Sequence, residues 1–122
     1  MNYRFSPTLD QARLSEFYDG DPLIATGVFE AFIQETVPAL NTLTTLFESG
    51  QREEFRKLVH KLKPGFLYVG LTPLFEQMSE LETQCDRVND VSELRLYYDQ
   101  VKKGLVQGMP IVEQELEKLK AY

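Results

Sequence analysis

The sequence of 122 residues contains one cysteine, one histidine and no tryptophan. The single cysteine, Cys85, cannot form an internal disulfide, and one cysteine with one histidine cannot build a metal cluster. No apolar run approaches the roughly 18 residues of a membrane span, and the N-terminus lacks the apolar segment of a secretory signal. We therefore expect a cytoplasmic protein without a bound metal, in which Cys85 is a buried structural thiol.

Basic residues are also scarce, with 13 Lys and Arg against 19 Asp and Glu, so the formal net charge is −6 at pH 7. Nucleic acids and anionic membranes both require an extended basic surface, and this composition argues against either partner. The length is that of one domain with a single core, so we treat residues 1–122 as one domain and take a monomer as the default.

No strand-like alternation persists anywhere in the sequence, whereas helical periodicity recurs between Gly and Pro residues. Helices are predicted over residues 8–18, from residue 22 to about 48, from about 51 to 70, and from residue 72 onward. A last helix is predicted from about residue 90 almost to the C-terminus. Four long amphipathic helices joined by short turns favour an all-α fold, an antiparallel four-helix bundle with a short N-terminal capping helix.

Several helix starts carry capping signals. Asp21-Pro22 and Thr72-Pro73 each place a side-chain acceptor before a proline, and Asp90 with Glu93 resembles a capping box. Three further prolines fall inside predicted helices and should bend them, because proline removes a backbone hydrogen bond. These prolines are Pro38, Pro64 and Pro110.

The second helix carries two apolar stripes on different sides. One stripe consists of Ile24, Val28 and Phe32, and the other of Phe29, Ile33, Val37 and Leu40. One stripe should belong to the core. The other either packs under the first helix or provides a docking surface for a partner.

The only histidine, His60, lies on the outer side of the third helix. At about 100° of rotation per residue, the apolar positions share one face, and His60 falls nearly opposite. These apolar positions are Phe55, Leu58, Val59, Leu62, Phe66 and Val69. The outward neighbours of His60 include Arg56, Lys57 and Lys63. An acidic protein therefore places its one imidazole among positive charges. That arrangement suits a histidine that meets an anion, although an ordinary surface histidine would fit the geometry alone.

The residues around His60 form a recognisable pattern. His60-x-Leu62-Lys63 is followed by Val69-Gly70 at nine and ten residues past the histidine, and by Leu81-Glu82 on the next helix. Together with the helical layout, this pattern resembles the signature of histidine-containing phosphotransfer (HPt) domains.

The resemblance implies a phosphorelay carrier. His60 would accept a phosphoryl group from a receiver-domain aspartate and pass it to another receiver, and Lys63 would stabilise the transferred group. The implied partners are receiver domains of hybrid histidine kinases and response regulators, and Mg²⁺ would belong to the receiver, with no cofactor bound by this chain. No Walker-type loop is present, so we do not expect an ATP-dependent kinase.

Other residues near the motif could support the histidine or meet a partner. Glu82 should lie at the edge of the apolar face of its helix, where it either accepts a hydrogen bond from the His60 ring or pairs with a lysine. Lys57 and Arg56, one turn before His60, could add supporting charge. Pro64 and Leu67 lie where a partner would approach, and Pro64 departs from the family pattern, which usually has Gly there.

A different class of function remains open on this sequence. The same bundle could serve as a non-catalytic helical adaptor that binds receiver domains or other signalling proteins, with His60 incidental. A hydrolytic or metal enzyme is a poor interpretation, because one histidine without a second ligand does not make such a site.

Overall fold

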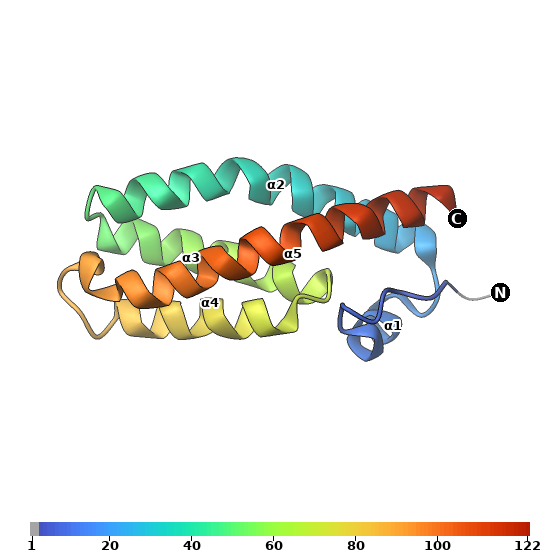
Figure 1. The fold of residues 1–122 in the computed structure, drawn as a ribbon, viewed down its shortest axis with the longest axis horizontal. Helices are drawn as coiled ribbons and strands as arrows, with labels where there is room; N and C mark the ends of the chain where they lie inside the picture. Colours follow the sequence, from blue (N-terminus) through green and yellow to red (C-terminus); the bar gives the residue numbers. More distant parts are fainter. Residues whose placement is uncertain (1–2) are drawn as a thin grey trace.

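The computed structural model describes residues 3–122, which form five α-helices and one short 3₁₀-helix (Figure 1). The helices are α1 (Gln11–Tyr18), α2 (Pro22–Glu48), α3 (Arg52–Tyr68), α4 (Thr72–Cys85), η1 (Val91–Leu94) and α5 (Arg95–Ala121). Residues 3–122 contain no strand. The prediction of an all-α helical bundle is confirmed.

Helices α2, α3, α4 and α5 lie side by side along the long axis of the molecule, and their connections alternate between its two ends (Figure 1). Helix α1 lies at the end that also holds the C-terminus. Helix α3 packs against both α2 and α4, and α5 packs against the same two helices. The position of α3 between α2 and α4 therefore gives His60 two different neighbouring helices.

Local capping explains most of the helix boundaries. The Asp21 carboxylate accepts hydrogen bonds from the backbone N–H groups of Leu23 and Ile24, and Pro22 occupies the first turn, as predicted. Asp90 and Glu93 do form a capping box, but this capping box opens η1, and α5 begins only after it. The expectation that the capping box starts the last helix was therefore wrong by one short 3₁₀ turn.

Thr72 does not cap α4. It lies inside the first turn, and Leu71 occupies the capping position without a side-chain hydrogen bond. The Thr72 hydroxyl instead donates to the Asp10 carboxylate, with 2.7 Å between the oxygens. This hydrogen bond, together with one from the Arg13 backbone N–H, lowers the pKa of Asp10. Thr72, which was expected to cap α4, therefore attaches the beginning of α1 to α4.

The core follows the predicted helical face on α3, and Cys85 is fully buried, as expected. Pro38, Pro64 and Pro110 lie inside helices that continue past them, and the bends expected there stay predictions.

The two stripes expected on α2 do not divide into one core and one surface stripe. Phe29 and Phe32, one from each stripe, are both buried, whereas Ile24 and Val37, again one from each, are exposed. The prediction of a single core stripe was therefore wrong. The buried residues of α2 are Ala25, Phe29, Phe32, Thr36, Leu43 and Phe47.

Gly70 allows the N-terminal residues to dock on the turn between α3 and α4. It has a φ of +80°, and a Cβ built on it would come within 2.8 Å of a Leu14 methyl carbon and 3.1 Å of the Asp10 nitrogen. The Asp10 N–H donates to the Gly70 carbonyl oxygen at 2.9 Å. Both the backbone conformation and the close approach therefore require glycine at this position of the motif.

A buried carboxylate that the sequence analysis missed holds the N-terminal segment to α5. Glu115 is 3% exposed and accepts hydrogen bonds from the Tyr3 hydroxyl and the Ser6 backbone N–H. Lys118 lies 3.5 Å from the same carboxylate. These contacts satisfy a charge that would otherwise be costly to bury.

Helix α2 is long and apolar enough, by length and composition, to cross a bilayer, with a mean hydropathy of 1.2. This criterion differs from the one applied to the sequence, because polar residues such as Glu30, Glu35 and Asn41 interrupt α2 and it holds no long uninterrupted apolar run. One such helix is weak evidence for a membrane span, because core helices pass the same test.

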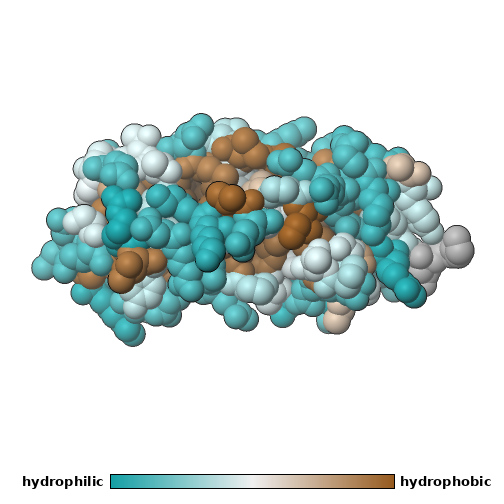
Figure 2. Space-filling view, in the orientation of Figure 1, coloured by the Kyte–Doolittle hydropathy of each residue, from teal (hydrophilic) through white to brown (hydrophobic). Residues whose placement is uncertain are grey.

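The face drawn in Figure 1 is largely hydrophilic, with apolar patches near its middle (Figure 2).

Candidate functional site

His60 lies near the middle of α3 with its ring directed toward solvent and α4. Its side chain is 66% exposed, and its Nδ1 atom lies 2.8 Å from Oε2 of Glu82. The outward orientation agrees with the helical phase expected from the sequence. The ring is therefore accessible and is also held on one side by a neighbouring helix.

Glu82 is the residue of α4 that organises this region. It is only 9% exposed, and its second oxygen, Oε1, lies 2.8 Å from Nζ of Lys63. The two alternatives for Glu82, a hydrogen bond to His60 and an ion pair with a lysine, are both present, one on each oxygen. Burial opposes the ionisation of Glu82, but the hydrogen bonds and positive charge of Lys63 and His60 outweigh it and lower its pKa.

The ionised state of Glu82 determines which nitrogen of His60 carries the proton. A carboxylate can only accept hydrogen bonds, so Nδ1 must be the donor in this pair. In the neutral imidazole, the lone pair then lies on Nε2. Among residues 3–122, none forms a hydrogen bond with Nε2. The arrangement therefore presents an unprotonated nitrogen at the surface, as a nucleophilic or basic histidine requires.

Arg56 joins the same cluster, whereas Lys57 does not. Arg56 lies 2.8 Å from the Asp86 carboxylate and 3.8 Å from the Glu82 carboxylate. Lys57 pairs with Glu54 at 3.7 Å on the outer surface of α3. We call Arg56, Lys63, Glu82 and Asp86 the charged cluster, and its two cations and two anions cancel.

Lys63 is partly buried between α3 and α4. Its side chain is 23% exposed, and its ammonium group lies 5.9 Å from the centre of the Phe75 ring. The apolar stem therefore packs in the seam between the two helices, and the charge is directed to Glu82. The position one turn after His60 follows from the i, i+3 spacing in the sequence.

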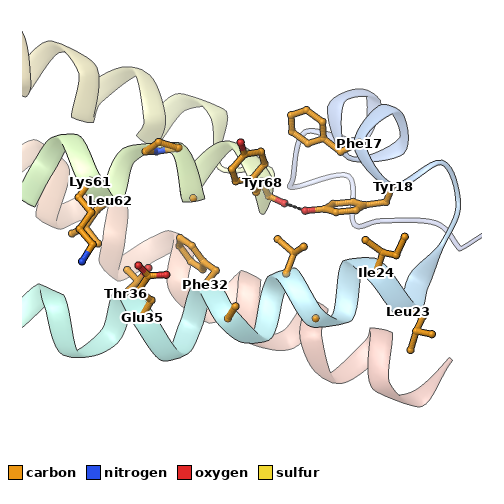
Figure 3. Close-up of a pocket in the computed structure, with 15 residues that line it drawn as sticks. Phe17, Tyr18, Leu23, Ile24, Phe32, Glu35, Thr36, Lys61, Leu62 and Tyr68 are labelled. Carbon is orange, nitrogen blue, oxygen red and sulfur yellow. Dashed lines mark hydrogen bonds between the residues drawn. The ribbon is translucent and has the colours of Figure 1, made fainter.

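The opposite side of α3, toward α2, carries an apolar groove of about 760 Å³ (Figure 3). Helix α3 contributes Lys61, Leu62, Pro64, Gly65 and Tyr68, α2 contributes Leu23, Ile24, Gly27, Val28, Ala31, Phe32, Glu35 and Thr36, and α1 contributes Phe17 and Tyr18. Leu23 is 81% exposed and Ile24 is 56% exposed. The groove therefore leaves large apolar side chains open to solvent, and it begins at Lys61, the residue after His60.

Gly65 and Tyr18 shape this groove. A Cβ on Gly65 would come within 2.9 Å of the Phe32 ring, so glycine lets this ring lie against α3. The Tyr18 hydroxyl donates to the Tyr68 carbonyl at 2.6 Å and fixes α1 at the end of α3. Burial and the neighbouring Tyr68 raise the pKa of Tyr18 to about 12, so its hydroxyl remains a donor at neutral pH.

The two residues predicted to face an approaching partner lie in different environments. Pro64 is exposed and lines the groove one turn after His60, in a helix that continues to Tyr68. Leu67 is half-buried and does not line the groove. The structure therefore brings Pro64, and not Leu67, to the groove.

Most residues that line the groove were not singled out from the sequence as site residues, among them Phe17, Lys61 and Tyr68. Phe17 is 41% exposed, and its ring lies 5.5 Å from that of Tyr68. Lys61 also lines the groove, and among residues 3–122 it has no ion pair. The available signal was Tyr68, a large aromatic residue outside the predicted apolar face of its helix.

No group of three or more His, Cys, Asp or Glu side chains in residues 3–122 is arranged to hold a metal ion.

Comparison with known proteins gives one match. The model of the Hpt domain family matches residues 27–122 and so covers α3, α4 and α5 and most of α2. The comparisons with curated proteins and with solved structures both found no match. The matched range includes His60, Lys63 and Glu82 but not α1, which forms one wall of the groove.

Proposed function

The chain belongs to the Hpt domain family, whose members carry phosphoryl groups in the phosphorelays of two-component signalling, and we propose that His60 is its phosphoacceptor. Such domains are carriers and not kinases. We further propose that residues 1–122 act as one such domain, as a cytoplasmic monomer.

The observation that carries this proposal is the hydrogen bond between Nδ1 of His60 and the ionised Glu82 carboxylate. It leaves the lone pair on Nε2, in a ring that is 66% exposed. In the proposed step, Nε2 forms a bond to phosphorus while the bond between phosphorus and the aspartyl oxygen of the receiver breaks. The aspartate keeps the electron pair, and the proton on Nδ1 stays on the ring.

Lys63 is the proposed stabiliser of the transferred group. Phosphoryl transfer spreads charge over three equatorial oxygens, and a positioned cation stabilises this charge. Lys63 lies one turn from His60 on the side of α4, where it is paired with Glu82 at rest. Arg56 holds Asp86 and Glu82 in place and supports this arrangement from the preceding turn.

The apolar groove is the proposed docking surface for the receiver. It begins beside His60, is open to solvent and exposes Leu23 and Ile24, as a protein-binding surface requires. A receiver seated there would bring its aspartate and its Mg²⁺ toward Nε2. We place the Mg²⁺ in the receiver and propose receiver domains of hybrid histidine kinases and response regulators as donors and acceptors.

The charge of α3 favours the same partner. This helix carries Arg52, Arg56, Lys57, Lys61 and Lys63 against Glu53 and Glu54, whereas the whole chain has a net charge of −6. The catalytic pocket of a receiver must be acidic to hold a metal ion. The basic helix would therefore attract the acidic pocket and keep the rest of this acidic protein away from it.

The direct test is incubation with a phosphorylated receiver domain, followed by detection of acid-labile, alkali-stable phosphate on this chain. We expect label on the wild-type protein and none on His60→Gln, with both proteins folded by circular dichroism. Label that persists in His60→Gln would place the acceptor elsewhere.

A non-catalytic adaptor is the second candidate, and the size and exposure of the groove favour it. Binding alone does not separate the two functions, because the groove should bind a receiver in the His60→Gln variant as well. Wild-type protein that binds receivers but takes no label from any of a broad panel would establish the adaptor function.

A further inference from the structure

We infer that Glu82 controls how strongly this domain retains a phosphoryl group, because it holds Lys63 away from the phosphorylation site in the resting state. This inference rests on the proposed function of His60. It concerns Glu82 as a positioning residue, since Glu82 contacts neither the phosphoryl group nor Nε2.

The two oxygens of Glu82 serve the two residues that the reaction needs. Oε2 fixes the Nδ1–H of His60, and Oε1 holds the ammonium group of Lys63, each at 2.8 Å. A phosphoryl group on Nε2 would need the same ammonium group. Lys63 must therefore leave Glu82, wholly or in part, when the phosphoryl group arrives, and Glu82 competes with it for the lysine.

The balance of charge points the same way. The charged cluster has no net charge at rest, since Arg56 and Lys63 cancel Glu82 and Asp86. Transfer of a phosphoryl group adds one negative charge to this neutral site. With a neutral residue at position 82, the same charge would enter a site of net charge +1, which is more favourable at these short distances.

An amide at position 82 would separate the two roles of the carboxylate. Glutamine keeps an oxygen that accepts from Nδ1–H, but it forms no ion pair with a lysine. Glu82→Gln should therefore preserve the orientation of His60 and release Lys63 for the phosphoryl group. The wild-type glutamate makes the phosphohistidine less stable, which favours onward transfer over storage.

The test measures how phosphate divides between this protein and one receiver domain, loaded with acetyl phosphate and used for every variant. Because the receiver is the same throughout, ratios of the equilibrium constants report only on the free-energy difference between the phosphorylated and unphosphorylated forms of this protein. We expect Glu82→Gln to raise the equilibrium constant for phosphate on this protein about tenfold, equivalent to about 1.4 kcal/mol. Glu53→Gln, which removes the same charge from an exposed site on α3, should change it less than twofold.

A double-mutant cycle with Lys63→Ala isolates the competition for the lysine. If Glu82 acts by holding Lys63, the tenfold gain from Glu82→Gln should fall to about threefold or less in the Lys63→Ala background. An equal gain in both backgrounds, or no gain in the wild-type background, would overturn the inference.

A separate measurement shows whether Glu82→Gln leaves the ring in place. The ¹⁵N spectrum of the imidazole should keep the proton on Nδ1 in the variant, and loss of this tautomer would contradict the separation of roles. Failure of the proposed function is distinguishable, because the wild-type protein would then take no phosphate at all.

Discussion

The two sides of α3 that flank His60 differ in almost every physical property. Toward α4 the side chains are charged, partly buried and paired at 2.8 Å, with Glu82 contacting both His60 and Lys63. Toward α2 the surface is an open apolar groove whose residues make few polar contacts. The difference suggests a division of labour, in which the α4 side supports the chemistry and the α2 side binds the partner.

This division has a structural cause. The seam between α3 and α4 is closed, so ions buried there need partners. The groove between α3, α2 and α1 stays open because α1 meets α3 at Tyr68, at the end of that helix, through the hydrogen bond from Tyr18 and the ring of Phe17. A substitution on one side should therefore leave the function of the other side intact.

The largest effect is expected on the α4 side. Lys63→Ala should slow phosphoryl transfer at saturating receiver by one to two decades, because it removes a charge-assisted interaction worth roughly 1.5–3 kcal/mol. Rapid-quench kinetics would measure this rate. The receiver concentration at half-saturation should not change, and an unchanged rate would remove Lys63 from the mechanism.

Gly70→Ala tests how much the docking of the N-terminal residues on the turn between α3 and α4 contributes to stability. We expect a loss of about 2–3 kcal/mol in the free energy of unfolding, measured in urea, from a positive φ and from contacts with Leu14 and Asp10. Gly50→Ala is the matched control, since Gly50 has a φ of +73° but a Cβ placed there would meet nothing within 4 Å. Equal losses in the two variants would show that the close approach at Gly70 contributes nothing.

The groove itself is tested by a pair of exposed leucines. Leu23→Glu should raise the receiver concentration at half-saturation about tenfold, because it replaces apolar area that a bound receiver would cover. Leu96→Glu on α5 is the control, since Leu96 is 84% exposed and Leu23 is 81% exposed. Similar effects from both substitutions would contradict a specific role for the groove.

The smallest expected effect is on the pH dependence of stability, through Glu82 on the α4 side. In the folded state the pKa of Glu82 lies below its ordinary value of 4.5. The ion pairs of Glu82 therefore stabilise the fold fully above pH 4.5, and this stabilisation is lost as the pH falls through the lowered pKa. Glu82→Gln should therefore be less stable than wild type at pH 7, by about 1 kcal/mol or less, and this difference should shrink toward pH 3. Urea unfolding at several pH values measures this difference in the free energy of unfolding. A difference that grows toward acid pH would contradict the stabilising role of the ionised Glu82.

The sequence was most informative where structure is local. Asp21-Pro22 predicted the start of α2, and the i, i+3 spacing placed Lys63 beside His60, because both depend only on helical geometry. Contacts across helices were harder to predict. Both contacts considered for Glu82 are present, one on each carboxylate oxygen, and the sequence does not reveal how deeply the residue lies between α3 and α4.

A docking surface on α2 was one alternative left open by the sequence, and Ile24, Val28 and Phe32 do line the groove, but neither the form of the groove nor the N-terminal docking was predicted. The groove depends on the close approach of Phe32 to Gly65, which helical periodicity alone does not reveal. The contact between Tyr3 and Glu115 joins residues 112 positions apart. Both features depend on how the helices and the N-terminal segment pack in three dimensions.

The most direct test of the division between the two sides of α3 is the concentration dependence of transfer from one phosphorylated receiver, measured for wild type, Lys63→Ala and Leu23→Glu. We predict that Lys63→Ala lowers only the saturating rate and that Leu23→Glu raises only the half-saturating concentration. If Leu23→Glu lowered the saturating rate, or if both variants changed the same parameter, the two sides of α3 would not have separate roles.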